Sequence, residues 1–254
     1  MTLMIALLHR PLMLITARDW RGTENLPAAG GCVVVTNHVS EVDPVTFGHF
    51  IIDNGRLPRF LGKAEVFKVP VLGQILTSAK QIPVYRKTAD AAQAFRAAVA
   101  AVEAGECVIV YPEGTLSRDP EMWPMTGKTG AARIALTTGC PVIPCAQWGP
   151  NELLPPYARK PALLPRKVMR VRAGAPVDLS DLQEKRLTPA VLREATERIM
   201  AAITALLEDI RGGHAPSSRF DSKAAGMADI GNPNNVRNKH IPGRTKPPGV
   251  GESA

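Results

Sequence analysis

A histidine and an aspartate lie five positions apart in the stretch Asn37–Pro44, which reads NHVSEVDP. His38 follows a short apolar run, and Asp43 precedes a proline that can occupy the first turn of a helix capped by that aspartate. A turn between them can bring the carboxylate to one ring nitrogen, which fixes the tautomer and stabilises the imidazolium formed when the other nitrogen takes a proton. The pair therefore offers general-base catalysis. A helix cap beside an ordinary loop histidine explains the same spacing, so the motif alone decides nothing.

A second stretch of reactive residues, Tyr111–Ser117 (YPEGTLS), also follows a short apolar run. Its glycine lets the backbone approach a ligand closely, and its hydroxyls and amides can bind phosphate or sugar oxygens. A capped turn is the structural alternative for this stretch taken by itself. In α/β folds, however, binding and catalytic groups gather in loops that follow the carboxyl ends of strands, and both stretches occupy such positions.

Together, and in this order, these motifs resemble those of the PlsC-like glycerolipid acyltransferases, the 1-acylglycerol-3-phosphate acyltransferase family. The resemblance covers about residues 20–180, and four ordered blocks are more specific than any one of them. The blocks are N-H-x-x-x-x-D at His38 and Asp43, a second block at Gly62–Phe67 with Pro70, Gly73 and Arg86, an F-P-E-G-T-R-S-like block at Tyr111–Ser117, and a V-I-P-V-like block at Val142–Cys145.

The resemblance implies transfer of an acyl group from acyl-CoA or acyl carrier protein to the free hydroxyl of 1-acylglycerol 3-phosphate, which gives phosphatidic acid in phospholipid biosynthesis. It implies that His38 is the general base and that Asp43 orients it. The transfer is direct in this pattern, so Ser40 is interpreted as a turn residue, and no G-x-S-x-G elbow surrounds it. The thioester is a co-substrate, and neither a metal nor a bound cofactor is expected; the histidines and cysteines show no zinc-ligand spacing.

The phosphate of the acceptor requires cationic partners. Lys63 and Arg86 match basic positions of the second block. The third block departs from the family pattern, because Leu116 stands where an arginine is usual. Either Arg118 or Lys128 substitutes for it, or the acceptor head group differs, which leaves glycerol 3-phosphate and other lysolipids as alternative acceptors.

The remaining polar positions of the third block are also expected to contact substrate. Gly114 allows close approach of the backbone, and Thr115 and Ser117 supply hydroxyls. Glu113 is expected to contact glycerol hydroxyls or to hold a basic neighbour rather than to act as a second base.

Apolar strand-like runs alternate with helical patterns along the chain, which predicts a single α/β domain with a mostly parallel mixed sheet flanked by helices. No repeat and no domain boundary is evident before about residue 211. The predicted strands are 31–36, 59–62, 81–85, 107–111, 141–148 and 167–173, and the predicted helices are 43–52, 71–79, 88–104, 128–138 and 189–210.

The two ends of the chain differ from this core, which is assigned to residues 21–210. Residues 1–20 are apolar but are interrupted by His9, Arg10 and Pro11, so they predict an N-terminal helix in a membrane interface; a helix docked on its own core is the alternative. Residues 211–254 are basic and rich in proline and glycine, which predicts a disordered tail.

Charge and composition narrow the class of partner. The 254 residues carry a net charge of +8, half of it in the range 211–254, and 45% of them are hydrophobic, which excludes a wholly disordered chain. The +8 charge suits phospholipid, thioester and membrane-surface partners, and 5% aromatic residues without a groove-reading motif argue against nucleic acid. Four unpaired cysteines suit the cytosol, so a peripheral position on the cytoplasmic face of the membrane is expected. The alternative to an enzyme is a non-catalytic module that binds membrane surfaces.

Overall fold

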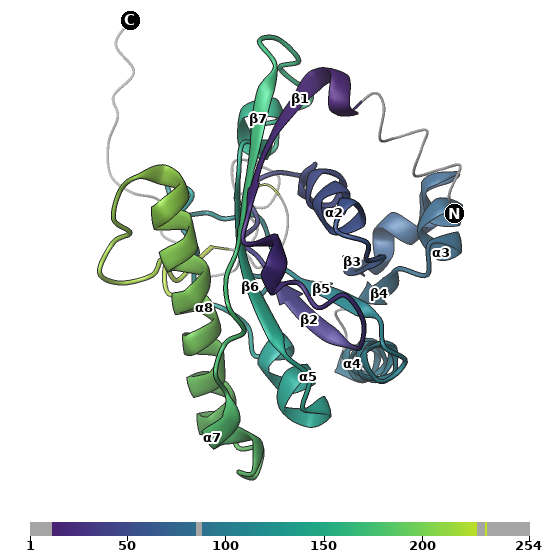
Figure 1. Cartoon of the computed structure of the whole chain (residues 1–254), viewed down its shortest axis with the longest axis vertical. Coiled ribbons are helices and arrows are strands. Elements are labelled where there is room, and N and C mark those ends of the chain that lie inside the picture. The colour runs from purple at the N-terminus through teal and green to yellow at the C-terminus, as the bar shows by residue number, and fades with distance from the viewer. Residues whose placement is uncertain (1–11, 85–87, 228–231, 233–254) are drawn as a thin grey trace, which may run out of the picture.

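The computed structural model describes residues 12–84, 88–227 and 232, with backbone alone at 88–91. It confirms an α/β domain with one mostly parallel mixed sheet (Figure 1). Seven strands lie in the order β1-β7-β6-β2-β5-β3-β4, and only β6 and β7 pair antiparallel. The strands are β1 (Thr16–Arg21), β2 (Cys32–Val35), β3 (Pro58–Lys63), β4 (Ile82–Val84), β5 (Cys107–Val110), β6 (Val142–Trp148) and β7 (Lys167–Ala173).

Helices cover both faces of this sheet, as Figure 1 shows for α2 and α8. Successive residues of each central strand pack against the helices on opposite faces, because side chains in a strand point alternately to the two sides of the sheet. Val33 and Val35 of β2 pack with α4, α5 and α8, whereas Val34 packs with α2. The α-helices are α2 (Asp43–Asp53), α3 (Leu72–Ser78), α4 (Thr88–Glu103), α5 (Gly130–Thr138), α6 (Pro150–Leu153), α7 (Ser180–Gln183) and α8 (Pro189–Arg211), with 3-10 turns η1 (Thr23–Asn25) and η2 (Ala64–Lys68).

The elements with strong apolar periodicity agree closely with the sequence prediction. The strands at β2, β5 and β6 and the helices α4, α5 and α8 begin and end within about two residues of their predicted bounds. Cys32 and Cys107 face each other across β2 and β5 as buried thiols, and Cys145 is buried in β6. The prediction of reduced, buried cysteines is confirmed for these three.

The structured domain extends beyond the predicted bounds of 21 and 210. Residues 16–20 belong to edge strand β1, which pairs in parallel with β7, rather than to an interface segment; residues 1–11 lie outside the described residues. At the other end, the chain does not become disordered at residue 211. The Phe220 carbonyl accepts a hydrogen bond from the Thr126 backbone, and Ala215 N–H donates to Glu208. The added segments are polar, and the partners of β1 and of Phe220 lie about 90 residues or more away in sequence, which a local pattern does not reveal.

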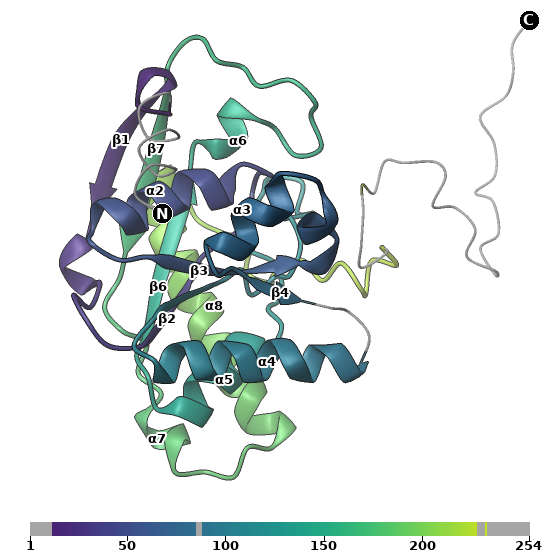
Figure 2. The same cartoon turned by 90° about the vertical axis from the view of Figure 1, so that its right-hand side faces the viewer.

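Strand order brings the two reactive loops together. β2 and β5 are parallel neighbours, so the loops that follow Val35 and Val110 leave the same edge of the sheet. β6, the other parallel neighbour of β2, ends at Trp148 beside them. Figure 2 shows α4 and α5 side by side beneath this sheet. Within the described residues, no helix combines the length and the apolar character that crossing a bilayer requires.

Candidate active site

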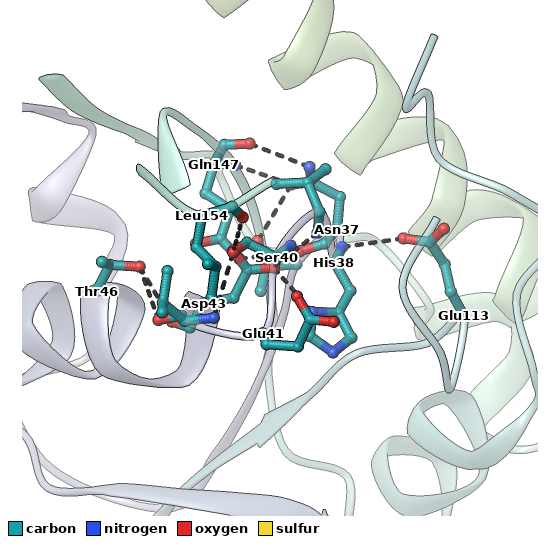
Figure 3. Close-up of polar contacts among 12 residues, drawn as sticks. Asn37, His38, Ser40, Glu41, Asp43, Thr46, Glu113, Gln147 and Leu154 are labelled. Carbon is teal, nitrogen blue, oxygen red and sulfur yellow. Dashed lines mark hydrogen bonds and ion pairs between the residues drawn. The ribbon is translucent and has the colours of Figure 1, made fainter. Parts of the chain in front are cut away.

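The His38 imidazole is held by the Asp43 carboxylate, as the spacing predicts. Nδ1 lies 2.8 Å from Asp43 Oδ2, and the same oxygen accepts the backbone N–H groups of Val39 at 2.7 Å and Ser40 at 3.0 Å (Figure 3). Asp43 is fully buried and is the first residue of α2. It therefore does not cap that helix, because its carboxylate turns back onto the preceding turn. A carboxylate accepts only, so Nδ1 carries the ring proton and Nε2 keeps its lone pair.

Asn37 anchors this turn to the neighbouring strand. Its Nδ2 donates to the Gln147 carbonyl at 3.0 Å, and its Oδ1 accepts from Gln147 N–H at 2.8 Å. The Gln147 side chain in turn donates to the Asn37 carbonyl at 3.0 Å. Both residues are buried, and these three hydrogen bonds hold the turn against β6. Sequence analysis missed this pair, because nothing in β6 marks Gln147 as a partner 110 residues away.

The face of the imidazole is covered by Tyr111, the first residue after β5. Their ring centroids are 4.2 Å apart with an interplanar angle of 20°, and Phe60 of β3 stacks on the other side of Tyr111 at 6.2 Å. The stack limits rotation of the His38 ring about its side-chain bonds. In the sequence, the aromatic residue that follows β5 is the feature from which this contact could have been predicted.

Glu113 joins the two loops through hydrogen bonds to their backbone. Its Oε1 accepts from the His38 backbone N–H at 3.1 Å, and its Oε2 accepts from Met125 N–H at 3.1 Å. Figure 3 shows it approaching His38 from the side opposite Asp43. The side chain is buried and is not among the residues that line the pocket, so its expected contact with glycerol hydroxyls stays a prediction from the sequence. Burial raises the pKa of Glu113 to about 8, against the opposing effect of the two amide donors.

Three other polar side chains of these loops are structural. Ser117 Oγ donates to the Trp123 carbonyl at 2.7 Å, while its N–H donates to the His38 carbonyl at 2.7 Å. Ser40 Oγ donates to the Leu154 carbonyl at 2.6 Å, in agreement with its interpretation as a turn residue. Arg118 is buried, and neither it nor Ser117 lines the pocket, so the structure does not place them at a substrate. The Ser117 hydroxyl is thus used by the backbone of its own loop.

A pocket of about 1210 Å³ opens at His38. Of the residues expected to bind substrate, Lys63, Gly114, Thr115 and Lys128 line it. Gly114 has a φ of 68°, and a Cβ there would come within 3.0 Å of Lys128 Nζ, so the lysine lies directly over this glycine. Arg86 lies outside the described residues. The same pocket is thus lined by His38, the general-base candidate, by two exposed lysines, and by Gly114, where a ligand can approach the backbone closely.

The rest of the pocket wall is mostly apolar. Leu116, where the family pattern has arginine, contributes to this wall. Such a lining accommodates hydrocarbon, while the polar groups stay near His38. No cluster of three metal-ligating side chains occurs within the described residues. The apolar lining includes Val45, Ile52, Phe60, Leu61, Val66, Phe67, Leu72, Ile75 and Leu76.

Residues 18–148, which contain β2, β5 and both reactive loops, match the sequence model of the family described as Acyltransferase. The chain belongs to the acyltransferase family. The match includes the pocket residues from His38 to Lys128. The α/β fold and the lipid-biosynthetic class of the family are therefore those of this chain.

Curated relatives share this region. The chain is 32% identical over 139 residues to the 1-acyl-sn-glycerol-3-phosphate acyltransferase BAT2 of Brassica napus, covering 54% of this chain and 39% of that one. It is 29% identical over 182 residues to the 1-acyl-sn-glycerol-3-phosphate acyltransferase of Bacillus subtilis, covering 69% and 83% of the two chains. The chain thus spans about two fifths of the first relative and most of the second.

Solved structures confirm the fold. The crystal structure of the acyltransferase PlsC from Thermotoga maritima matches with a TM-score of 0.60 and 24% identity, and the match covers 82% of this chain and 78% of that one. The acyltransferase domain of this chain therefore has the same arrangement of sheet and helices as that protein.

The buried Glu113 predicts a specific pH dependence of stability. Its folded pKa of about 8 lies above the ordinary value of 4.5, so the folded state binds the extra proton between these pH values. The free energy of unfolding therefore falls as pH rises from 4.5 to 8, by roughly 1.4 kcal/mol for each unit of pKa difference. Glu113→Gln removes this contribution. Urea titrations of the wild type and Glu113→Gln at several pH values measure the free energy of unfolding. The same pH dependence in both proteins would contradict a raised pKa for Glu113.

Proposed function

We propose that this chain is a 1-acyl-sn-glycerol-3-phosphate acyltransferase, which transfers an acyl group from a thioester to the free hydroxyl of lysophosphatidate and forms phosphatidic acid. The observation that carries the proposal is the 2.8 Å contact between His38 and Asp43 at the mouth of a large apolar pocket. The printed names of the relatives from Brassica napus and Bacillus subtilis support the choice of acceptor. The donor is acyl-CoA or acyl carrier protein, which acts as a co-substrate.

His38 Nε2 is the proposed general base. It takes the proton of the acceptor hydroxyl while that oxygen attacks the thioester carbonyl carbon. The carbon–sulfur bond then breaks, and the imidazolium returns the proton to the leaving thiolate. Asp43 stabilises the imidazolium between these two steps, and its two backbone donors keep the carboxylate in place.

The oxyanion formed at the thioester carbonyl requires hydrogen-bond donors. We assign this role to the backbone N–H groups of Thr115 and Leu116. Both residues line the pocket that contains His38, and these two N–H groups donate no hydrogen bond within the described part of the chain. Gly114, in the left-handed conformation just before them, turns this backbone toward the pocket.

Lys63 and Lys128 are the proposed partners for substrate phosphates. Both are exposed cations on the pocket wall, whereas Arg118 is buried behind it. Lys128 is thus the better candidate to replace the arginine absent at position 116. That Arg86 binds a substrate phosphate stays a prediction from the resemblance alone. Acylation of glycerol 3-phosphate or of another lysolipid is the second candidate function, and Leu116 is the observation that favours it.

We further propose that the protein acts on the cytoplasmic face of a membrane as a peripheral protein. The side chains of Val69, Val71 and Leu72 are 46%, 67% and 42% exposed, and Leu72 lines the pocket. An apolar rim of this kind lets a lipid acceptor enter the pocket from the bilayer. Co-sedimentation of the full chain with phospholipid vesicles tests this placement, and failure to bind would contradict it.

Replacement of the general base tests the proposed function most simply. His38→Ala is expected to lower kcat for acyl transfer to lysophosphatidate by about 10²–10⁴, because proton transfer in the transition state is lost. The assay uses a defined acyl-CoA and an acyl carrier protein thioester, with lysophosphatidate, glycerol 3-phosphate and other lysolipids as competing acceptors. Lys185→Ala is the control, since that exposed side chain pairs with Asp181 and lies outside the pocket lining.

The outcomes of this panel separate the candidate functions. A preference for lysophosphatidate supports the leading proposal, and a preference for another acceptor supports the second candidate. If wild-type chain binds vesicles without turnover on any acceptor, it is a non-catalytic membrane-surface module. Near-normal turnover of His38→Ala would overturn the general-base assignment.

Lys128 yields a separate prediction. Lys128→Met is expected to raise KM for a phosphorylated substrate about tenfold, because a charge-assisted contact worth roughly 1.5–3 kcal/mol is lost. The same substitution at Lys185, an exposed residue that pairs with Asp181, is the control and leaves KM unchanged. Steady-state kinetics with acceptor and donor varied in turn show which phosphate Lys128 binds. Unchanged KM values for both would exclude it from the site.

A further inference from the structure

The last residue of α8, Arg211, lies between two tryptophans. Its guanidinium carbon is 3.9 Å from the ring centroid of Trp123 and 4.6 Å from that of Trp148. Its NH1 donates to the Glu121 carbonyl at 2.9 Å. Trp123 belongs to the loop after β5, and Trp148 ends β6. A planar cation between two indoles fixes the distance and the tilt of both, so α8 ties this loop to the sheet.

The segment after α8 adds a second attachment. We call residues 212–221 the C-terminal strap. Arg219 forms an ion pair with Glu197 of α8, which directs the strap back along the helix. The Phe220 carbonyl then accepts the Thr126 backbone N–H at 3.1 Å. Arg211 and the strap therefore hold both ends of the short stretch from Trp123 to Thr126.

Two hydrogen-bonded routes run from this stretch to His38. Met125 N–H binds one oxygen of Glu113, whose other oxygen binds the His38 N–H. The Trp123 carbonyl accepts from Ser117 Oγ, and Ser117 N–H donates to the His38 carbonyl. The backbone of the general base is thus fixed on both its N–H and its carbonyl by groups that the 123–126 stretch positions.

We propose that Arg211 and the C-terminal strap are positioning elements for His38, which hold the 123–126 stretch so that Glu113 and Ser117 can fix the backbone of the general base. The inference rests on the proposed role of His38. It concerns residues that lie beyond the family match at 18–148. The chemistry of the site therefore depends on a part of the chain outside the matched motifs.

The test compares two arginines of one helix in the full-length chain. Arg211→Met keeps an apolar group between the indoles and removes the planar cation. Arg198→Met removes an arginine that pairs with Asp181 and Glu194 instead. We expect kcat to fall about tenfold in Arg211→Met with KM for either substrate within twofold, because the base is misplaced while the pocket persists. Arg198→Met is expected to leave both parameters unchanged.

Hydrogen exchange gives a readout that requires no turnover. The backbone amides of His38 and Met125, which both donate to Glu113, are expected to exchange at least tenfold faster in Arg211→Met and at the wild-type rate in Arg198→Met. Unchanged exchange together with unchanged kcat would overturn the proposal. A lower melting temperature with normal kcat below it would also overturn it, since that outcome shows a purely structural role.

A charge swap covers the case in which Arg211→Met does not fold. Arg219→Glu places two carboxylates together between the strap and α8, and Glu197→Arg with Arg219→Glu restores an opposite-charge pair. Faster exchange of the two amides in the single variant and recovery in the double variant support the proposal; wild-type exchange in both overturns it. If the wild-type chain transfers no acyl group, the proposed function fails, and amide exchange still decides the positioning role.

Discussion

The contact between the Asp43 carboxylate and His38 Nδ1 is the interaction on which the site depends. It decides which nitrogen of the neutral ring carries the proton, and so which one is left for the proposed role of general base. Burying a carboxylate is costly, and the amides of Val39 and Ser40, which both donate to Oδ2, offset part of that cost; Oδ1 has no hydrogen-bond partner among the described residues. The turn after β2 therefore supplies both His38, the proposed base, and the amides that bind its partner Asp43.

The second constraint is that this turn must be held against the loop after β5. Glu113 provides the connection, and its raised pKa shows that burial of the carboxyl group opposes ionisation. The protein thus accepts a destabilising buried acid at a position where it fixes the backbone of His38. Buried polar groups that cost stability are expected where geometry matters more than stability, as at a catalytic loop.

Sequence patterns could predict the central sheet because Val33–Val35 and Val108–Val110 are uninterrupted apolar runs with one structural interpretation. The proximity of His38 and Asp43 was predictable because the contact is local. Edge strand β1 was not predictable, since TARDWR buries little and gains its structure from β7. The orientations of Glu113 and Ser117 depend on the backbone groups of His38, Met125 and Trp123, so motif spacing could not distinguish side chains that line the pocket from those that support it.

The protonation state of the His38 ring tests the central claim most directly. Nitrogen-15 NMR of the histidine ring at neutral pH distinguishes the two tautomers, and the spectrum of His38→Ala assigns the signal. We expect the neutral form of the ring to carry its proton on Nδ1, and we expect the other tautomer in Asp43→Asn. A neutral wild-type ring with its proton on Nε2 would contradict the proposed role of Asp43.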